Sequence, residues 1–209
     1  MKPSVPQNPA MPSRSADIFA AFADIFAAPL EAAGIAALRD DGRLGGLAPL
    51  SDQPLAQRAL DVLAGFDDAA EATSELNAAF CCLFLGAGGP HGNAPPYESA
   101  YAGHGRLFGE PTAEMTKMLA AHGLGVAEGC CEPPDHLAIE LALLAALLAG
   151  PGPAAAAAVR DRLLGWVPGF AARCAEADTT GFYAALAALL HAFLLDQAAL
   201  TPSEREIPS

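Results

Sequence analysis

The chain has 209 residues, a length that suits one domain with one sizeable hydrophobic core. Its 24 Asp and Glu residues outnumber 11 Lys and Arg, which gives a formal net charge of -13. This charge excludes duplex nucleic acid as a favoured partner, because phosphate binding depends on clustered basic residues. It suits a basic partner, although solubility alone would explain it equally well. Hydrophobic residues make up 53%, and much of this is alanine, so we predict an all-helical domain.

The N-terminal half is predicted to be a tail followed by four helices. Pro3, Pro6, Pro9 and Pro12 oppose regular structure, so residues 1–14 are expected to form a disordered tail. The predicted helices run from an N-cap region at Ser15–Asp17 to Pro29, from Leu30 to Arg39, from Pro54 to Ala64 and from Asp68 to Leu85.

A glycine- and proline-rich stretch, "GAGGPHGNAPP", ends the fourth helix. It opens a long polar loop near residues 86–110, which continues through "YESAYAGHGRLFGE" without a clear period. Loops of this length in compact domains are often functional. A helix from Pro111 to His122 is predicted next, because proline suits the first turn of a helix.

The stretch "CCEPPDHLAIEL" precedes an apolar helix in the C-terminal half. We predict that Asp135 is its N-cap, because this residue follows two prolines and directly precedes a leucine-rich face. "GPGP" ends that helix after Ala149. Further helices are predicted at Ala154–Leu164, Val167–Ala175 and Thr180–Gln197, followed by a disordered tail at residues 199–209, so that residues 15–198 form the single helical domain.

Two apolar runs, "LAIELALLAALLAG" and "FYAALAALLHAFLL", are predicted to be core helices. Each is shorter than the ~20 residues that a membrane span needs, and each contains an ionisable residue, Glu140 or His191. The first residues contain no apolar signal-peptide region. We therefore expect a cytoplasmic protein without stable membrane insertion. The five cysteines fit reduced thiols, because their number is odd and no CxxC occurs.

Several chemistries compete for the stretch from Cys130 to Glu140. Adjacent Cys130 and Cys131 suit zinc poorly, because structural zinc prefers CxxC-like spacing. An Asp135–His136 pair adjacent in sequence does not orient an imidazole for hydrolysis, and no phosphate-binding loop with its Lys-Ser/Thr end is found. We predict no enzyme activity, no metal and no cofactor. The structural interpretation is that Glu140 bonds another buried polar group.

Other candidate side chains are interpreted as parts of the core. Cys81 and Cys82 are expected to be small core hydrophobes, and Trp166 and Tyr183 to be core aromatics with satisfied polar tips.

A series of motifs adds to this picture. "APPYESAY" (Ala94–Tyr101), "LFGEP" (Leu107–Pro111), "GL" (Gly123–Leu124) and "EPPDHLAIEL" (Glu132–Leu141) follow one another. Together they resemble the TorD/DmsD family of cytoplasmic chaperones for molybdoenzymes. The resemblance extends over roughly Ala16–Gln197, since the Trp-containing segment and the terminal helix also agree.

The resemblance implies an all-α, single-domain helical bundle of the TorD/DmsD type without catalytic chemistry. Such a protein binds the twin-arginine leader, and possibly the body, of a molybdopterin-dependent oxidoreductase precursor, and delays export until the cofactor is inserted. It works as a monomer or a domain-swapped dimer. The leader-binding positions carried over to this sequence are Tyr97, Ser99, Glu132, Asp135, His136 and Glu140.

One departure from the family pattern concerns the residue before Asp135. Pro134 stands where family members often carry an acid, which leaves one carboxylate fewer for an arginine. Our hypothesis is that Asp135 both caps the helix and presents its carboxylate near a peptide groove. The alternative from the residues themselves is a metal- or nucleotide-binding regulatory helical protein.

Overall fold

The computed structural model describes residues 14–41, 44–89, 92–102, 108–127, 129–150 and 153–200. They form the helices α1 (Arg14–Ala27), α2 (Ala32–Asp41), α3 (Pro54–Gly65), α4 (Ala69–Phe84), α5 (Glu110–Ala121), α6 (Leu137–Ala149), α7 (Pro153–Ala177) and α8 (Phe182–Leu200), with short 3-10 helices η1 (Gly45–Leu50) and η2 (Glu98–Ala100). Within these residues no strand forms, and the all-α prediction is confirmed. The predicted disordered tails lie almost wholly outside the described residues.

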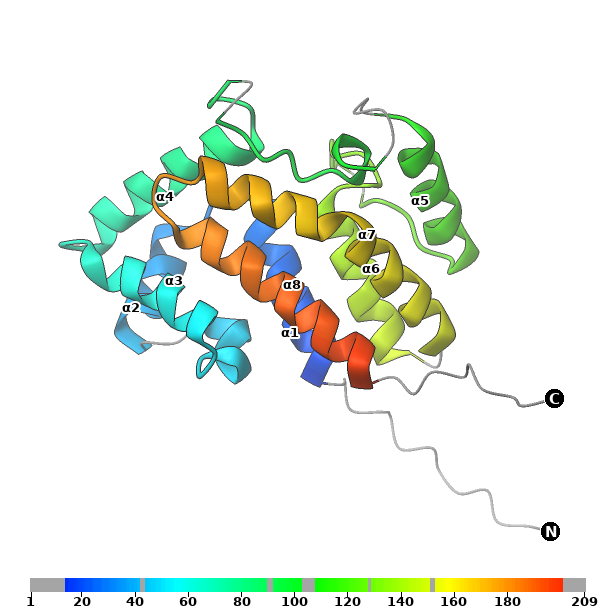
Figure 1. The fold of residues 1–209 in the computed structure, drawn as a ribbon, viewed down its shortest axis with the longest axis horizontal. Helices are drawn as coiled ribbons and strands as arrows, with labels where there is room; N and C mark the ends of the chain where they lie inside the picture. The colour runs from blue at the N-terminus through cyan, green and yellow to red at the C-terminus, as the bar shows by residue number, and fades with distance from the viewer. Residues whose placement is uncertain are drawn as a thin grey trace, which may run out of the picture.

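The helices form one bundle (Figure 1). α8 runs through the middle, packed against α7 and α3, while α1 packs chiefly against α6. In Figure 1, α2, α3 and α4 lie at one end of the molecule and α5 at the other. In the segment between α4 and α5, η2 lies next to α5 and α7, and Tyr97 forms a bridge with His136 just before α6.

Aromatic side chains from four helices fasten the centre of the bundle. The ring of Phe26 in α1 lies 5.8 Å from Phe84 in α4 and 5.6 Å from Phe170 in α7. Phe84 lies 5.3 Å from Tyr183 in α8. All four side chains are buried, and edge-to-face aromatic pairs of this kind are worth about 0.5–1.5 kcal/mol beyond their burial. This cluster fixes α1, α4, α7 and α8 relative to one another.

Both apolar runs are core helices, as predicted. α6 buries most of its side chains between α1 and α7. Among the described helices, α8 alone is long and apolar enough to cross a membrane by length and composition. Its apolar window is 44% buried inside the bundle, as expected for a central helix that packs on two neighbours.

The prediction of two separate helices at Ala154–Leu164 and Val167–Ala175 is wrong, because both ranges lie in the single helix α7. Pro168 lies inside this helix, where a proline costs about 3 kcal/mol. Trp166, Val167 and Phe170 are fully buried on either side of it. Burial of each large apolar side chain contributes about 1.5–3 kcal/mol, so packing outweighs the break that the local sequence favours.

The cysteines differ from the expectation in part. Cys82 is exposed and Cys81 only partly buried, so the prediction that both are core residues is wrong. They lie in the last turn of α4, where the bundle no longer covers the outer face. Cys174 is buried, whereas Cys130 and Cys131 are exposed.

Candidate functional site

The two motifs that the sequence singled out meet at the joint that leads into α6. Tyr97 and His136 form an isolated antiparallel bridge. The backbone N–H of Glu98 donates to the carbonyl of Asp135 at 3.0 Å, and that of Leu137 donates to the carbonyl of Pro96 at 2.8 Å. These bonds join the Tyr-x-Ser loop to the start of α6, although about forty residues separate them in the chain.

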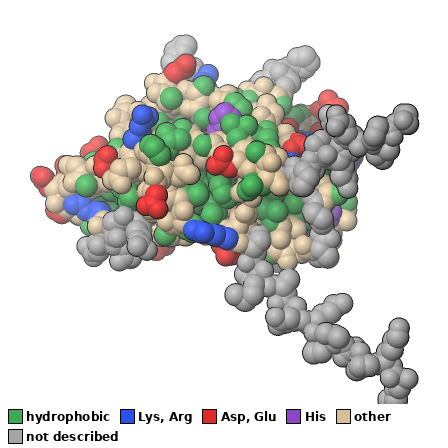
Figure 2. All heavy atoms as spheres, turned by 60° about the horizontal axis from the view of Figure 1, so that its bottom comes forward, with side chains coloured by type: hydrophobic (Ala, Val, Ile, Leu, Met, Phe, Trp, Pro, Cys, Tyr) green, Lys and Arg blue, Asp and Glu red, His purple; other side chains and the backbone are tan. Residues whose placement is uncertain are grey.

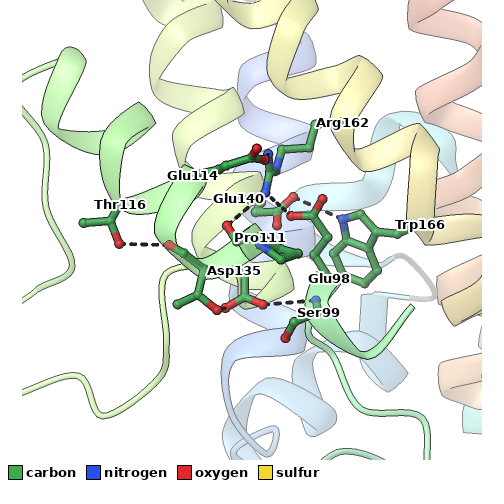
Figure 3. Close-up of polar contacts among 10 residues, drawn as sticks. Glu98, Ser99, Pro111, Glu114, Thr116, Asp135, Glu140, Arg162 and Trp166 are labelled. Carbon is green, nitrogen blue, oxygen red and sulfur yellow. Dashed lines mark hydrogen bonds and ion pairs between the residues drawn. The ribbon is translucent and has the colours of Figure 1, made fainter. Parts of the chain in front are cut away.

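Asp135 does not cap α6. Its side chain connects the start of α6 to the Tyr-x-Ser loop and to α5. Its carboxylate is fully buried and accepts hydrogen bonds from the backbone N–H of Ser99 at 3.1 Å and from the Thr112 hydroxyl at 2.8 Å (Figure 3). The predicted N-cap is therefore wrong by one residue. His136 has the extended backbone of the cap position, and its Nδ1 accepts from the N–H of Ala138 at 3.1 Å. Asp135 is already engaged by the loop and by α5.

The hydrogen bond from the Ala138 N–H determines the tautomer of His136. Because Nδ1 accepts a hydrogen bond, the neutral ring carries its proton on Nε2. Burial lowers the pKa of His136, and the negative charges of Glu132 and Asp135 oppose this shift only in part. The ring packs edge-on against Tyr97, with 5.2 Å between centroids. His136 is thus a neutral side chain that can donate one hydrogen bond from Nε2.

A buried pair of carboxyl groups lies beneath the joint. Glu140 is completely buried and Glu98 nearly so. The indole N–H of Trp166 donates to Glu140 at 3.2 Å, and the Arg162 guanidinium forms an ion pair with Glu98. Burial raises the pKa of Glu140 well above its usual value, and the negative charge of Glu98 adds to the shift. The surroundings of Glu140 therefore favour the protonated form of its carboxyl group.

Replacing Glu140 by Gln tests this protonation. The amide keeps an acceptor for Trp166 and a donor where the protonated carboxyl carries its O–H. A carboxyl whose pKa is raised by folding contributes stability that is complete below its unfolded pKa and is lost as the pH rises through its folded pKa. The wild type should therefore lose stability between about pH 5 and pH 8, and Glu140→Gln should lose about 1 kcal/mol less.

Urea unfolding at several pH values measures this difference. Glu176→Gln, at an exposed position of α7, serves as the control and should follow the wild type. Superimposable pH profiles for Glu140→Gln and the wild type would mean that Glu140 is ionised in the folded protein.

Arg162 connects the carboxyl pair to α5. Its guanidinium donates to the carbonyl of Pro111 at 2.9 Å and pairs with Glu114 at 2.7 Å, in addition to Glu98 (Figure 3). Reasoning from the sequence missed Arg162 and Thr112. They lie on α7 and α5 and share no spacing pattern with the motifs, so only the folded chain brings them together.

Tyr97 and Glu132 form the outer edge of the joint. The Tyr97 hydroxyl donates to one oxygen of Glu132 at 2.7 Å. Burial and the hydrogen bond to Glu132 both raise the pKa of the tyrosine. Both side chains are only partly buried, so this pair sits at the surface above the network formed by Asp135 and Glu140.

An apolar groove of about 410 Å³ begins at this edge. α6 lines it with Ala138, Ala142 and Ala146, which are four residues apart and therefore share one face of the helix. α6 adds Ile139 and Leu143, and the rest of the lining comes from α1, from Leu119 of α5 and from residues 124–127, Cys130, Glu132 and His136. Glu132 and His136 lie where the groove meets the joint. Figure 2 shows one face of the molecule, on which hydrophobic side chains form a broad area with scattered acidic side chains.

The structure thus separates the six predicted site residues into two groups. Glu132 and His136 line the groove, and Tyr97 is bonded to Glu132. Ser99, Asp135 and Glu140 are buried behind them. No group of three or more His, Cys, Asp or Glu that could hold a metal ion is found among the residues that the structure describes. The arrangement is an apolar groove beside a buried polar network.

Comparisons with known proteins identify relatives of this chain. A family model described as nitrate reductase delta subunit matches residues 49–172. "Chaperone protein TorD" of Vibrio cholerae serotype O1 (strain M66-2) is 37% identical over 147 residues, which are 65% of this chain and 66% of that protein. The protein of the same name from Vibrio parahaemolyticus serotype O3:K6 is 35% identical over 162 residues, 71% of this chain and 74% of that protein. The match thus spans just under two thirds of the Vibrio cholerae relative.

A solved structure shows the same fold. It is the crystal structure of a protein from Archaeoglobus fulgidus that is described as a redox enzyme maturation protein. The TM-score is 0.59 at 18% sequence identity, and the superposition covers 93% of this chain and 98% of the other. At this identity the likeness concerns the arrangement of the helices.

Proposed function

The chain belongs to the nitrate reductase delta subunit family, together with the TorD chaperones, and on that basis we propose that it is a chaperone for a molybdoenzyme precursor. It binds the twin-arginine leader of a molybdopterin-dependent oxidoreductase and delays its export until the cofactor is inserted. It acts in the cytoplasm, where the precursor is made, without catalysing a reaction. It works as a monomer or a domain-swapped dimer.

The groove along α6 is the observation that carries this proposal. A leader of this kind combines arginines with an apolar stretch, and the groove combines an apolar floor with a carboxylate at one end. The alanines of α6 leave room for a peptide helix or extended segment to approach closely. The oxygen of Glu132 that does not accept from Tyr97 carries the negative charge that attracts an arginine of the leader. The Nε2–H group of His136 can donate to a peptide carbonyl.

The buried side chains serve the same site by positioning it. Asp135 accepts from the backbone N–H of Ser99, which holds the Tyr-x-Ser loop against the start of α6, and Glu140 anchors the first turn of α6 to Trp166 of α7. Tyr97 then holds Glu132 at the edge of the groove. In this proposal Glu132 and His136 contact the leader. The buried residues Ser99, Asp135 and Glu140 fix the positions of these two side chains.

The native cysteines allow a direct test with the full-length protein. Cys130 lines the groove, whereas Cys82 is exposed on α4 and does not line it. A synthetic twin-arginine leader peptide should slow the alkylation of Cys130 and leave that of Cys82 unchanged, as measured by mass spectrometry of the digested protein. Equal rates at both cysteines with and without saturating peptide would place the leader elsewhere or exclude its binding.

Filling the groove is expected to block the peptide. In Ala142→Leu the larger side chain occupies the floor, so affinity for the leader should fall about ten-fold or more. Because Ala142 is exposed, the free energy of unfolding should stay within about 0.5 kcal/mol of the wild type. Ala172→Leu, at an exposed alanine of α7 outside the groove lining, is the matched control in the same calorimetric titration. Unchanged affinity of Ala142→Leu would contradict the proposed position of the peptide.

A further inference from the structure

Two carboxylates reach the groove from two different elements. Glu132 belongs to the segment before α6, and Asp24 belongs to α1, where it stands between Ala23 and Ala27 in the groove lining. No Lys or Arg is found among the lining residues. Within the described part of the chain, no hydrogen bond or ion pair involves the exposed side chain of Asp24. The groove therefore carries negative charge that its own residues do not compensate.

Glu132 and Asp24 differ in the hydrogen bonds that they already accept. One oxygen of Glu132 accepts the Tyr97 hydroxyl at 2.7 Å, and its other oxygen has no partner among the described residues. The carboxylate of Asp24 has both oxygens available and can accept two parallel N–H bonds from one guanidinium. The two acids thus differ in how they bind a cation, and they belong to different elements of the lining.

The geometry of an extended peptide provides the complementary pattern. Consecutive side chains of an extended segment point in opposite directions, so two adjacent arginines present their guanidinium groups on opposite sides of the peptide. A single carboxylate can meet only one of them. Two carboxylates on separate elements of a mainly apolar lining can meet both.

We propose that Asp24 is a second recognition residue of the groove, which binds one guanidinium of a tandem-arginine peptide while Glu132 binds the other. This inference rests on the proposed function and names what that site selects. It explains a preference for two adjacent cations over one, because each acid contributes only when its own arginine is present. The partner is a peptide with two adjacent arginines followed by an apolar stretch.

Calorimetric titration of the full-length protein with four leader peptides tests this assignment. The peptides carry both arginines, citrulline at the first, citrulline at the second, or citrulline at both; citrulline keeps the size of arginine and lacks its charge. Against the peptide with both arginines, Asp24→Asn and Glu132→Gln should each weaken binding about five-fold at low salt. Asp24→Asn should have no further effect on the one peptide that lacks its arginine, and Glu132→Gln none on the other.

Asp17→Asn is the matched control, since Asp17 is also an exposed acid of α1 but does not line the groove. It should bind all four peptides as the wild type does, which separates a specific pair from the general negative charge. If Asp24→Asn binds as tightly as the wild type, or if both acids are coupled to the same arginine, the inference is overturned while the proposed function stands. If the wild type binds none of the peptides, the proposed function fails and this inference fails with it.

Discussion

Arg162→Met is expected to lower the free energy of unfolding by about 3–5 kcal/mol, because it removes the positive charge from a buried cluster of acids. The guanidinium pairs with Glu98 and Glu114 and also donates to the carbonyl of Pro111. Methionine fills a similar volume but leaves Glu98 buried beside Glu140 with no compensating charge. The change therefore disturbs the joint even though Arg162 lies on α7, away from the motifs.

The deficit of this variant should depend on pH. Burial raises the pKa of Glu98 and Glu140, and Arg162 opposes the shift in both. Without the arginine both pKa values rise further, so the carboxyl groups are neutral over a wider range of pH. The missing charge then matters most above neutral pH, and the difference from the wild type shrinks as the pH falls through the raised pKa values.

Urea unfolding at several pH values between about 5 and 8 measures both effects. Arg58→Met, at an exposed position of α3, is the control and should remain within about 0.5 kcal/mol of the wild type. A loss below about 1 kcal/mol, or a loss that is the same at every pH, would show that the Glu98–Arg162 pair does not contribute as described.

Asp135→Ala is expected to cost about 3 kcal/mol of stability, because it leaves one buried and one partly buried donor without an acceptor. These donors are the backbone N–H of Ser99 and the hydroxyl of Thr112. Asp135→Asn should cost about 1 kcal/mol, since its amide oxygen can still accept from Ser99 and the Thr112 hydroxyl can turn to accept from its NH₂ group. Thermal and urea unfolding should therefore show that Asp135→Ala is clearly less stable than Asp135→Asn.

Asp135→Asn also separates positioning from contact. Because the carboxylate is fully buried and both of its oxygens are engaged, the folded Asn variant should bind a leader within about two-fold of the wild type. Thr112→Val, which removes one donor to Asp135, is the control for a loosened joint. A large loss of affinity in a stably folded Asn variant would mean that Asp135 itself contacts the peptide, as the resemblance implies.

Local sequence patterns determined the helices of this protein and their order. Most predicted ends lie within about two residues of those observed, since caps, prolines and apolar periods act over a few residues. The motif series also singled out the Tyr97–Ser99 and Glu132–Glu140 segments, which meet at the joint. Each motif consists of residues that are close together in the sequence.

Tertiary structure decided what depends on proximity between distant segments. Packing of Trp166 and Phe170 keeps α7 continuous through Pro168, against the local signal. Asp135 leaves the cap position to His136 because Ser99 and Thr112 already hold its carboxylate. The groove also forms only when separate helices pack, and Asp24 joins its lining for the same reason. The same holds for the pairing of Arg162 with Glu98. No spacing within a single segment encodes these features.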